Sequence, residues 1–424
     1  MNRRHFLFAS AAATAGLALP FGRDGWITRA AESDASHKRL VVIFLRGAVD
    51  GLSVVVPYGD DSYYGARRSI ALKPPGRDGG VLDLDGHFGL HPALAPLMTQ
   101  WRGGSLAFVQ ACGSPDPTRS HFDAQLYMEN GTPGRGATAD GWLNRLLAAL
   151  PGPRGPTQAL SFGPQMPRIL AGPQTVANIA LGQAAEKPLA VDRPGVSEAF
   201  AQLYGGDDKM SRTFQQGMAA RQQMAADMSA QNNAMMSDDR EQMAANNGAP
   251  LPQGFPDDAA RLARMMRQDP SIRVAFLALG GWDTHIGQGN AEGQLANRLK
   301  PLGEGLSKLV TGLGPSFQDT LIVVMSEFGR TVHENGNGGT DHGHGTVMWL
   351  LGGDVIGGKV HGAWPGLAED RLYQQRDLAV TSDFRAILGP AVSRHLHLPE
   401  GTASALFPGA PNVTGGGAPV LIRA

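Results

Sequence analysis

Histidine and carboxylate side chains gather in a few short turns of this 424-residue chain. Only 12 histidines are present, and His121, His285, His342 and His344 each lie within two residues of an aspartate or of another histidine. Mixed imidazole and carboxylate ligands suit a divalent ion such as zinc, manganese, iron, magnesium or calcium. The single cysteine, Cys112, excludes a disulfide within one chain, and it follows an apolar run that predicts a buried thiol.

The candidate ligands lie in four turns that are far apart in the sequence, and together they could hold one or two divalent ions. These candidates are Asp50, Asp283, His285, Glu327, His342 and His344. A further turn, residues 114–123, carries hydroxyl groups just before a predicted helix, and a helix N-terminus favours an anion or an activated hydroxyl. Ser120 in this turn could instead be no more than the cap of that helix.

The elements that must position these turns are five apolar runs rich in β-branched residues. Such runs are typical of strands that are buried on both faces of a sheet, and they are Arg39–Leu45, Leu106–Ala111, Arg273–Leu279, Thr320–Met325 and Thr346–Leu351. Helical patterns separate them at Pro92–Arg102, His121–Met128 and Asn297–Leu313. This alternation predicts an α/β fold with a largely parallel central sheet flanked by helices. Ligands of such sheets bind beyond the carboxyl ends of the strands, where most of the polar turns lie.

The N-terminus has the pattern of an export signal. Arg3 and Arg4 precede a weakly apolar run at residues 8–18, which predicts a cleaved twin-arginine signal within residues 1–31. The alternative, an N-terminal membrane anchor, is disfavoured because the run is too short for a hydrocarbon core of ~30 Å. We therefore expect a periplasmic or extracellular protein that meets the twin-arginine translocase during export. No second apolar segment is long enough for a stable membrane span in the mature form.

The rest of the chain, residues 38–424, is expected to form one α/β domain with a mostly helical insertion at residues 168–266. Within it, residues 211–247 are rich in methionine, and Met224, Met228 and Met235 have helical spacing. This predicts a long helix that packs its methionine face on the sheet domain, rather than a metal or haem site. A net charge of −1 indicates no electrostatic footprint for nucleic acid.

The order of these features resembles the alkaline phosphatase and sulfatase superfamily. An acid follows the first strand, a hydroxyl begins a helix, and an Asp with a His, a later acid and a final His follow. More closely, the mature chain resembles an exported bacterial family known as a domain of unknown function. The motifs that carry this second resemblance are FLRG at 44–47, GLS at 51–53, GLHP at 89–92, SPDPTRSHFD at 114–123, DGWL at 140–143, SEFGRT at 326–331 and GTDHGHG at 339–345.

The superfamily resemblance implies a fold like that of alkaline phosphatase and a site in which metal ions flank a nucleophilic hydroxyl. Asp50 would be the early metal-binding acid, and Asp283 and His285 would bind the other ion together with His342 or His344. The expected catalytic groups are Thr118 or Ser120 as the nucleophile, with Arg119 or Arg330 binding the ester oxygens.

Two departures from the superfamily pattern bear on this expectation. Phe328 stands where a metal-binding histidine is expected, and Asp283 and His285 are closer together than is usual. The leading hypothesis is an exported metal-dependent hydrolase of phosphate or sulfate esters, with a small-molecule or glycan substrate. The alternatives are a non-catalytic member that binds a partner or a surface glycan through the same crevice, and a purely structural metal site.

Overall fold

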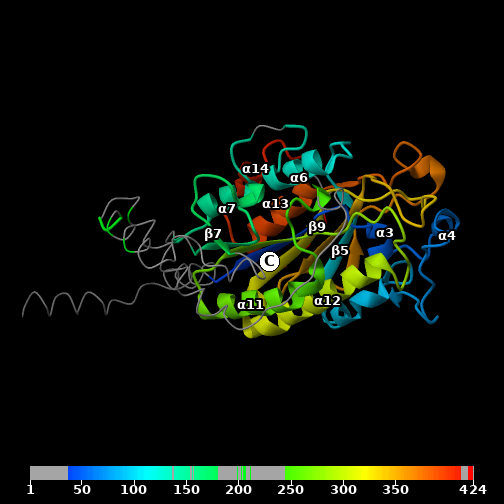
Figure 1. Cartoon of the computed structure of the whole chain (residues 1–424), viewed down its shortest axis with the longest axis horizontal. Coiled ribbons are helices and arrows are strands. Elements are labelled where there is room, and N and C mark those ends of the chain that lie inside the picture. Colours follow the sequence, from blue (N-terminus) through cyan, green and yellow to red (C-terminus); the bar gives the residue numbers. More distant parts are fainter. Residues whose placement is uncertain are drawn as a thin grey trace, which may run out of the picture.

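A nine-stranded sheet forms the centre of the protein (Figure 1). The computed structural model describes residues 37–135, 138–152, 155, 157–179, 198, 202, 204–206, 211, 244–411 and 419–423. Among the strands of this sheet that fall in those residues, β10 alone runs against the others. The order is β11 (Lys359–His361), β5 (Leu106–Gly113), β10 (Thr346–Leu351), β9 (Thr320–Ser326), β1 (Arg39–Leu45), β8 (Val274–Leu279), β6 (Ala159–Phe162) and β7 (Ala177–Ile179), and β12 (Ser382–Asp383) also pairs with β5.

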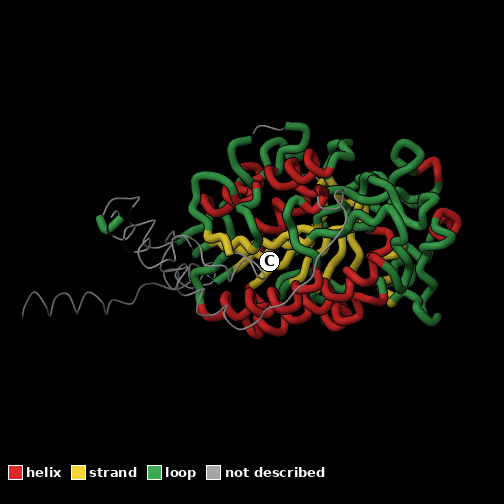
Figure 2. Tube along the Cα trace, viewed as in Figure 1, coloured by secondary structure: helices red, strands yellow, loops and turns green. Residues whose placement is uncertain are grey.

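Helices cover both faces of this sheet (Figure 2). One face carries α11 (Phe255–Gln268) and α12 (Gln294–Leu313), together with η1 (Pro92–Leu97) and α5 (Met98–Arg102). The opposite face carries α6 (His121–Asn130), α7 (Trp142–Ala149), α13 (Phe384–His395) and α14 (Thr402–Leu406). The shorter elements are α3 (Gly51–Val54), α4 (Asp61–Ala66), η2 (Arg168–Leu170), η5 (Pro252–Gly254), η6 (Gly314–Asp319), η7 (Glu369–Arg371) and a small sheet of β2 (Val55–Val56), β4 (Gly89–Leu90) and β3 (Leu82–Asp83).

The alternation of side chains along β1 explains why both faces are covered. Val41 and Ile43 pack into the core beneath α11 and α12, whereas Val42 and Phe44 pack into the core beneath α7 and α13. Every residue of β1 is buried, as expected for a parallel strand with helices on both sides. The fold class predicted from the sequence is therefore confirmed.

The five predicted strands are present, with shifts of no more than two residues at their ends. The helix predicted at 92–102 is split into a 3-10 turn and an α-helix, with Pro96 inside the turn because its ring cannot continue an α-helix. Strand β7 lies within residues 168–266, and the methionine-rich segment lies outside the described residues. The helical insertion therefore stays a prediction. Cys112 is buried in β5, as predicted. In the described part of the chain, no helix is long and apolar enough to span a bilayer.

Strand register brings the polar turns together. Leu45, the last residue of β1, pairs with Leu279 at the end of β8 and with Ser326 at the end of β9. Because these three strands are parallel and end at the same level, the turns that follow them leave the sheet side by side. These turns are residues 46–50, 280–285 and 327–331.

Candidate metal centre

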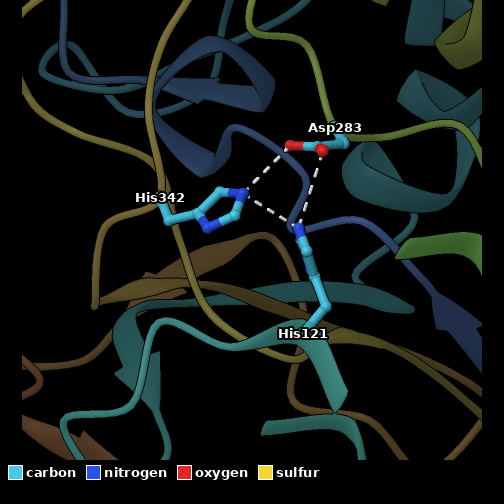
Figure 3. A group of neighbouring side chains, drawn as sticks. All are labelled: His121, Asp283 and His342. Atoms are coloured by element: carbon cyan, nitrogen blue, oxygen red, sulfur yellow. Dashed lines mark hydrogen bonds and ion pairs between the residues drawn. The ribbon is translucent and has the colours of Figure 1, made fainter. Parts of the chain in front are cut away.

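Three imidazole rings converge on Asp283 beyond the carboxyl ends of these strands, and Figure 3 shows two of them beside its carboxylate. His121 is the first residue of α6, His285 follows β8, and His342 lies in the turn before β10. The Nε2 atom of His342 is 3.0 Å from Nε2 of His121 and 3.1 Å from Nε2 of His285. The Asp283 carboxylate lies 3.0 Å from Nε2 of His285, 3.3 Å from that of His342 and 3.6 Å from that of His121.

The second nitrogen of each ring, Nδ1, faces an oxygen atom on the side away from Asp283. Such a bond fixes the tautomer of a metal-binding histidine and leaves its Nε2 lone pair directed at the centre. The three contacts are His121 Nδ1 to Glu327 Oε1 at 2.9 Å, His342 Nδ1 to the backbone oxygen of Arg119 at 2.9 Å, and His285 Nδ1 to Asp341 Oδ1 at 3.1 Å.

These contacts require a cation between the rings. A backbone carbonyl only accepts hydrogen bonds, so the proton of a neutral His342 is on Nδ1 and its Nε2 is a bare lone pair. The same holds for a neutral His121, whose Nδ1 faces the Glu327 carboxylate. Two lone pairs 3.0 Å apart repel each other. An additional proton, or a metal ion that both nitrogens bind, removes this repulsion.

The charges around the centre favour a cation there. Burial would raise the pKa of Asp283, but hydrogen bonds from the three histidines and the charge of Arg330 hold it far below its usual value. Arg330 Nη1 donates to Asp283 Oδ1 at 2.5 Å, and its own pKa is lowered by burial. Burial also lowers the pKa of His121, but hydrogen bonds to Asp283 and Glu327 outweigh it and raise that pKa to about 9. Without a metal ion, the site therefore holds a proton on His121.

Glu327 is the buried acceptor that orients His121. Its side chain is fully buried, and Oε1 accepts hydrogen bonds from the His121 ring, from Gln125 Nε2 at 3.1 Å and from the backbone N–H of Gly47 at 2.8 Å. Burial raises the pKa of Glu327, but these hydrogen bonds hold it below its usual value. The Phe328 ring stacks on the His121 ring at a centroid distance of 4.9 Å, and this contact further restricts the imidazole.

Glycine is required where the turns approach one another most closely. Gly47 has φ +113°, and a Cβ atom there would lie 2.8 Å from the backbone nitrogen of Asp283. A Cβ atom on Gly339 would lie 2.3 Å from the carbonyl oxygen of His285. Any larger residue at either position would push apart the turns that bring the ligands together.

Two predicted ligands make other contacts. The Asp50 carboxylate binds the Arg67 guanidinium through both oxygens, at 2.5 and 3.0 Å, and both side chains are fully buried. Burial raises the pKa of Asp50, but Arg67 outweighs this and lowers it. His344 stacks on the Tyr373 ring at a centroid distance of 4.7 Å, and burial lowers its pKa. A third predicted ligand, Glu327, reaches the centre only through the ring of His121.

The predicted catalytic side chains are engaged in local or internal contacts. Ser120 is the N-cap of α6, and its hydroxyl accepts a hydrogen bond from the N–H of Asp123. The Thr118 hydroxyl accepts from the N–H of Ser120 at 3.2 Å. Arg119 binds the buried carboxylate of Asp377 at 2.6 Å, and Arg330 is bound to Asp283. Neither arginine points an unpaired guanidinium toward a substrate.

His121 is the residue at the centre that sequence reasoning did not place among the ligands. The sequence did group it with the other three histidines that lie beside acids. Its position in the long motif at 114–123, directly after the predicted hydroxyl, was the signal that could have identified it. Arg67, which neutralises Asp50, lies in a part of the chain without any such signal.

The chain belongs to a family that is described as a protein of unknown function, DUF1501, whose model matches residues 37–405. Residues 1–20 match the signal sequence of the twin-arginine translocation pathway, which confirms the predicted export across the membrane. No curated protein is similar enough in sequence to match the chain.

Several solved structures are similar to this one. A protein in the alkaline phosphatase superfamily from Vibrio parahaemolyticus is 10% identical with a TM-score of 0.41, over 85% of this chain and 66% of that one. The lipoteichoic acid synthase LtaP from Listeria monocytogenes is 9% identical with a TM-score of 0.35, over 87% of this chain and 74% of that one. The C-terminal periplasmic domain of EptC from Escherichia coli, in complex with zinc, is 11% identical with a TM-score of 0.34, over 74% of this chain and 73% of that one.

Proposed function

We propose that this member of the DUF1501 family binds one divalent metal ion outside the cytoplasm and hydrolyses a phosphate or sulfate ester there. The ligands would be His121, Asp283 and His342, with His285 as a fourth. The observation that carries the proposal is the pair of Nε2 atoms, on His121 and His342, that face each other at 3.0 Å while both Nδ1 atoms are engaged elsewhere.

The donor atoms fit the dimensions of one ion. Four ligands held ~2.0–2.1 Å from a tetrahedral zinc ion are ~3.3 Å from one another. The Nε2 atoms of His121 and His342 are 3.0 Å apart and lie 3.6 and 3.3 Å from different oxygens of Asp283, Oδ2 and Oδ1. With one donor atom taken from each residue, the three donors lie within 4.8 Å of one another. His285 Nε2 lies within 3.1 Å of both Asp283 and His342, where it can complete the set. Because imidazole nitrogens predominate, zinc, manganese or iron fits better than magnesium or calcium.

The contacts of Asp50 support a site for one ion rather than two. A second ion held by Asp50, as the superfamily resemblance implies, would have to displace the bidentate Arg67 guanidinium. Gln288 Nε2 also donates to Asp50 Oδ2 at 2.7 Å, and Ser53 donates to the same oxygen at 2.7 Å. The arginine therefore already supplies the positive charge that this buried acid needs.

The centre has a route to solvent on one side. The side chains of His285 and His342 are 38% and 26% exposed, whereas those of His121 and Asp283 are 9% and 7% exposed. A bound divalent ion at such a site polarises an ester oxygen and lowers the pKa of an attacking hydroxyl or water. The chain itself holds the imidazoles in the metal-binding tautomer through Glu327, the backbone oxygen of Arg119 and Asp341.

Ser120 is the candidate for the attacking hydroxyl. Ser120 is exposed and directly precedes His121, and its hydroxyl hydrogen is not used in capping α6. We propose Ser120 rather than Thr118 as the attacking hydroxyl, with water as the alternative. If Ser120 attacks, Ser120→Ala abolishes turnover. If water attacks, the same variant loses only the helix cap, about 1 kcal/mol of stability.

Metal analysis tests the proposal directly. The mature protein, isolated after export, is expected to carry one divalent ion per chain, and His121→Ala and His342→Ala are expected to carry far less. His361→Ala is the matched control, because its half-buried ring binds a backbone carbonyl away from the centre. Aryl phosphate and aryl sulfate esters are then screened with the metal-loaded protein. A protein that binds no divalent ion, and gains no thermal stability on adding one, would contradict the proposal.

A second candidate function has one specific observation in its favour. Arg119 and Arg330, which the sequence predicted to bind the ester oxygens, are both committed to internal carboxylates. The same metal centre could therefore bind a partner or a surface glycan without catalysis. A metal-loaded protein that cleaves no ester in the screen would favour this second candidate.

A further inference from the structure

A cavity of about 300 Å³ lies beside the metal centre, on the far side of Gln125. Its walls come from Arg46 directly after β1, from α6, β6 and β8, from the segment after β6 and from residues 247–250. Gln125 lines the cavity, and its amide also donates to Glu327, the acceptor that orients His121. None of the four proposed metal ligands lines this cavity. The cavity is therefore separate from the metal centre, and Gln125 lies between the cavity and Glu327.

Three buried hydrogen-bond donors on residues that line this cavity have no partner among the described residues. They are Nε of Arg46, Nε of Arg168 and the hydroxyl of Ser161. Ser161 is 0% exposed and Arg46 is 6% exposed. A buried polar group without a partner destabilises the fold. Three of them around one cavity indicate a ligand that brings acceptor oxygens.

The charge of the cavity wall is positive. Arg46 is neutralised by Glu129, since Nη2 of the arginine lies 2.7 Å from Oε1 of the glutamate. The other carboxylate oxygen of Glu129 accepts from the backbone N–H of Ile169. Arg168 donates through Nη2 to the backbone oxygen of Thr138, and no carboxylate in the described residues forms a salt bridge with it. One positive charge is thus left to attract an anion.

The remainder of the wall is apolar and would hold the body of such a ligand. Aromatic and aliphatic side chains from three elements line it: Phe122, Leu126, Phe162, Met166, Phe276 and Ala278. Phe122 is 62% exposed and Met166 is 42% exposed, so both present apolar surface to solvent in the absence of a ligand. A volume of about 300 Å³ is at the lower end of the range for small-molecule sites, ~300–1,000 Å³.

We propose that this cavity binds a small organic anion, a carboxylate carried on an apolar body. The carboxylate oxygens would accept hydrogen bonds from Ser161 and from the Nε atoms of Arg46 and Arg168, and the apolar body would lie against the aromatic side chains. The proposal needs no metal ion and no ester hydrolysis, so it stands or fails independently of the proposed function.

Binding of phenylacetate, measured by calorimetry or ligand-observed NMR, tests this proposal. Phenylacetamide is the matched probe, because it has almost the same shape but carries no charge. Phenylacetate is expected to bind with a Kd in the millimolar range or below, at least tenfold more tightly than the amide. In Arg168→Gln this preference is expected to fall at least threefold, because the uncompensated charge is gone.

A blocking variant shows whether the cavity is the site. Gly163 lines the cavity, and a Cβ atom there would meet nothing nearer than the backbone oxygen of Gln165 at 3.8 Å, so Gly163→Trp is sterically feasible. It is expected to weaken phenylacetate binding at least tenfold. Gly65→Trp on α4 is the matched control, because a Cβ atom there has open space and lies away from the cavity. This control is expected to bind phenylacetate like the wild type.

The metal centre could itself attract a carboxylate, so the titrations are repeated after metal removal and in His121→Ala. Unchanged binding in both supports the cavity as the site. The proposal is overturned if phenylacetate does not bind, if the amide binds equally well, if Gly163→Trp binds normally, or if binding disappears with the metal. None of these outcomes bears on whether the centre cleaves an ester.

Discussion

The substitution Glu327→Gln tests the role that the structure gives to this buried carboxylate. It removes one negative charge while keeping the shape of the side chain. If the amide oxygen takes the place of Oε1, it still accepts from His121, Gln125 and Gly47. The amide nitrogen then replaces Oε2, which lies 3.1 Å from the hydroxyl of Ser326. The variant is therefore expected to fold and to change mainly the electrostatics of the His121 ring.

The expected loss of metal affinity is about 10–100-fold, the usual cost of removing an outer partner of a metal-binding histidine. This corresponds to about 1.4–2.7 kcal/mol of binding free energy. The metal-free protein gives a second readout. Glu327 helps to raise the pKa of His121 to about 9, so that pKa is expected to fall in the variant. The stabilisation from protonating His121, which is complete below ~6.5 and lost as the pH rises through about 9, is expected to shrink.

Competition with a metal-sensitive chelator measures the affinity, and NMR titration of the metal-free protein follows the ring of His121. Glu129→Gln is the matched control, because Glu129 is a buried carboxylate on α6, the helix that carries His121, but it pairs with Arg46. This control is expected to lower stability without changing metal affinity. The reasoning is refuted if Glu327→Gln changes the metal Kd less than threefold, or if Glu129→Gln changes it equally.

Three further predictions follow from the remaining contacts. Asp50→Asn leaves Arg67 buried without its partner and is expected to lower the free energy of unfolding by about 3–5 kcal/mol, while metal analysis still finds one ion per chain; a loss of metal would restore Asp50 as a ligand. His344→Ala removes only a stacking contact, so chelator competition should give a metal Kd within twofold of the wild type, and a tenfold loss would contradict this. A hydrogen bond from His395 and a nearby lysine lower the pKa of Asp354 to about 2, so Asp354→Asn should cost about 1–2 kcal/mol in urea unfolding at pH 7. This cost should vanish as the pH falls from ~4 through about 2, and a cost independent of pH would show that the charge is not its cause.

The strands that the sequence predicted are fully buried runs of six to eight residues. The run at residues 39–45 is apolar at six of its seven positions, because both of its faces are covered by helices. Strand β6 has the sequence ALSF and contains no β-branched residue, so its pattern does not differ from that of a short loop. Its place in the sheet is determined by pairing with β8, which is more than a hundred residues away in the sequence. Local pattern cannot reveal a pairing of this kind.

The sequence located the turns of the candidate site but not the directions of their side chains. His342 and His344 are two residues apart in one turn, yet one faces Asp283 and the other faces Tyr373. Each of the two histidines is followed by a glycine in the same turn, and no spacing rule shows which of them faces the centre. The choice depends on the path of the turn, which passes close to the backbone of other turns at its glycines.

The distribution of charge supports a single divalent ion. Asp50 and Asp283 each contact an arginine, Arg67 and Arg330, so these two acids are already balanced. Glu327 and Asp341 bond the outer nitrogens of the imidazoles, and no arginine or lysine among the described residues lies within salt-bridge distance of either. The two negative charges of Glu327 and Asp341 are matched by one divalent cation at the Nε2 atoms of the imidazoles. A second divalent ion would add two positive charges, and only an anionic substrate could supply the negative charges that balance them.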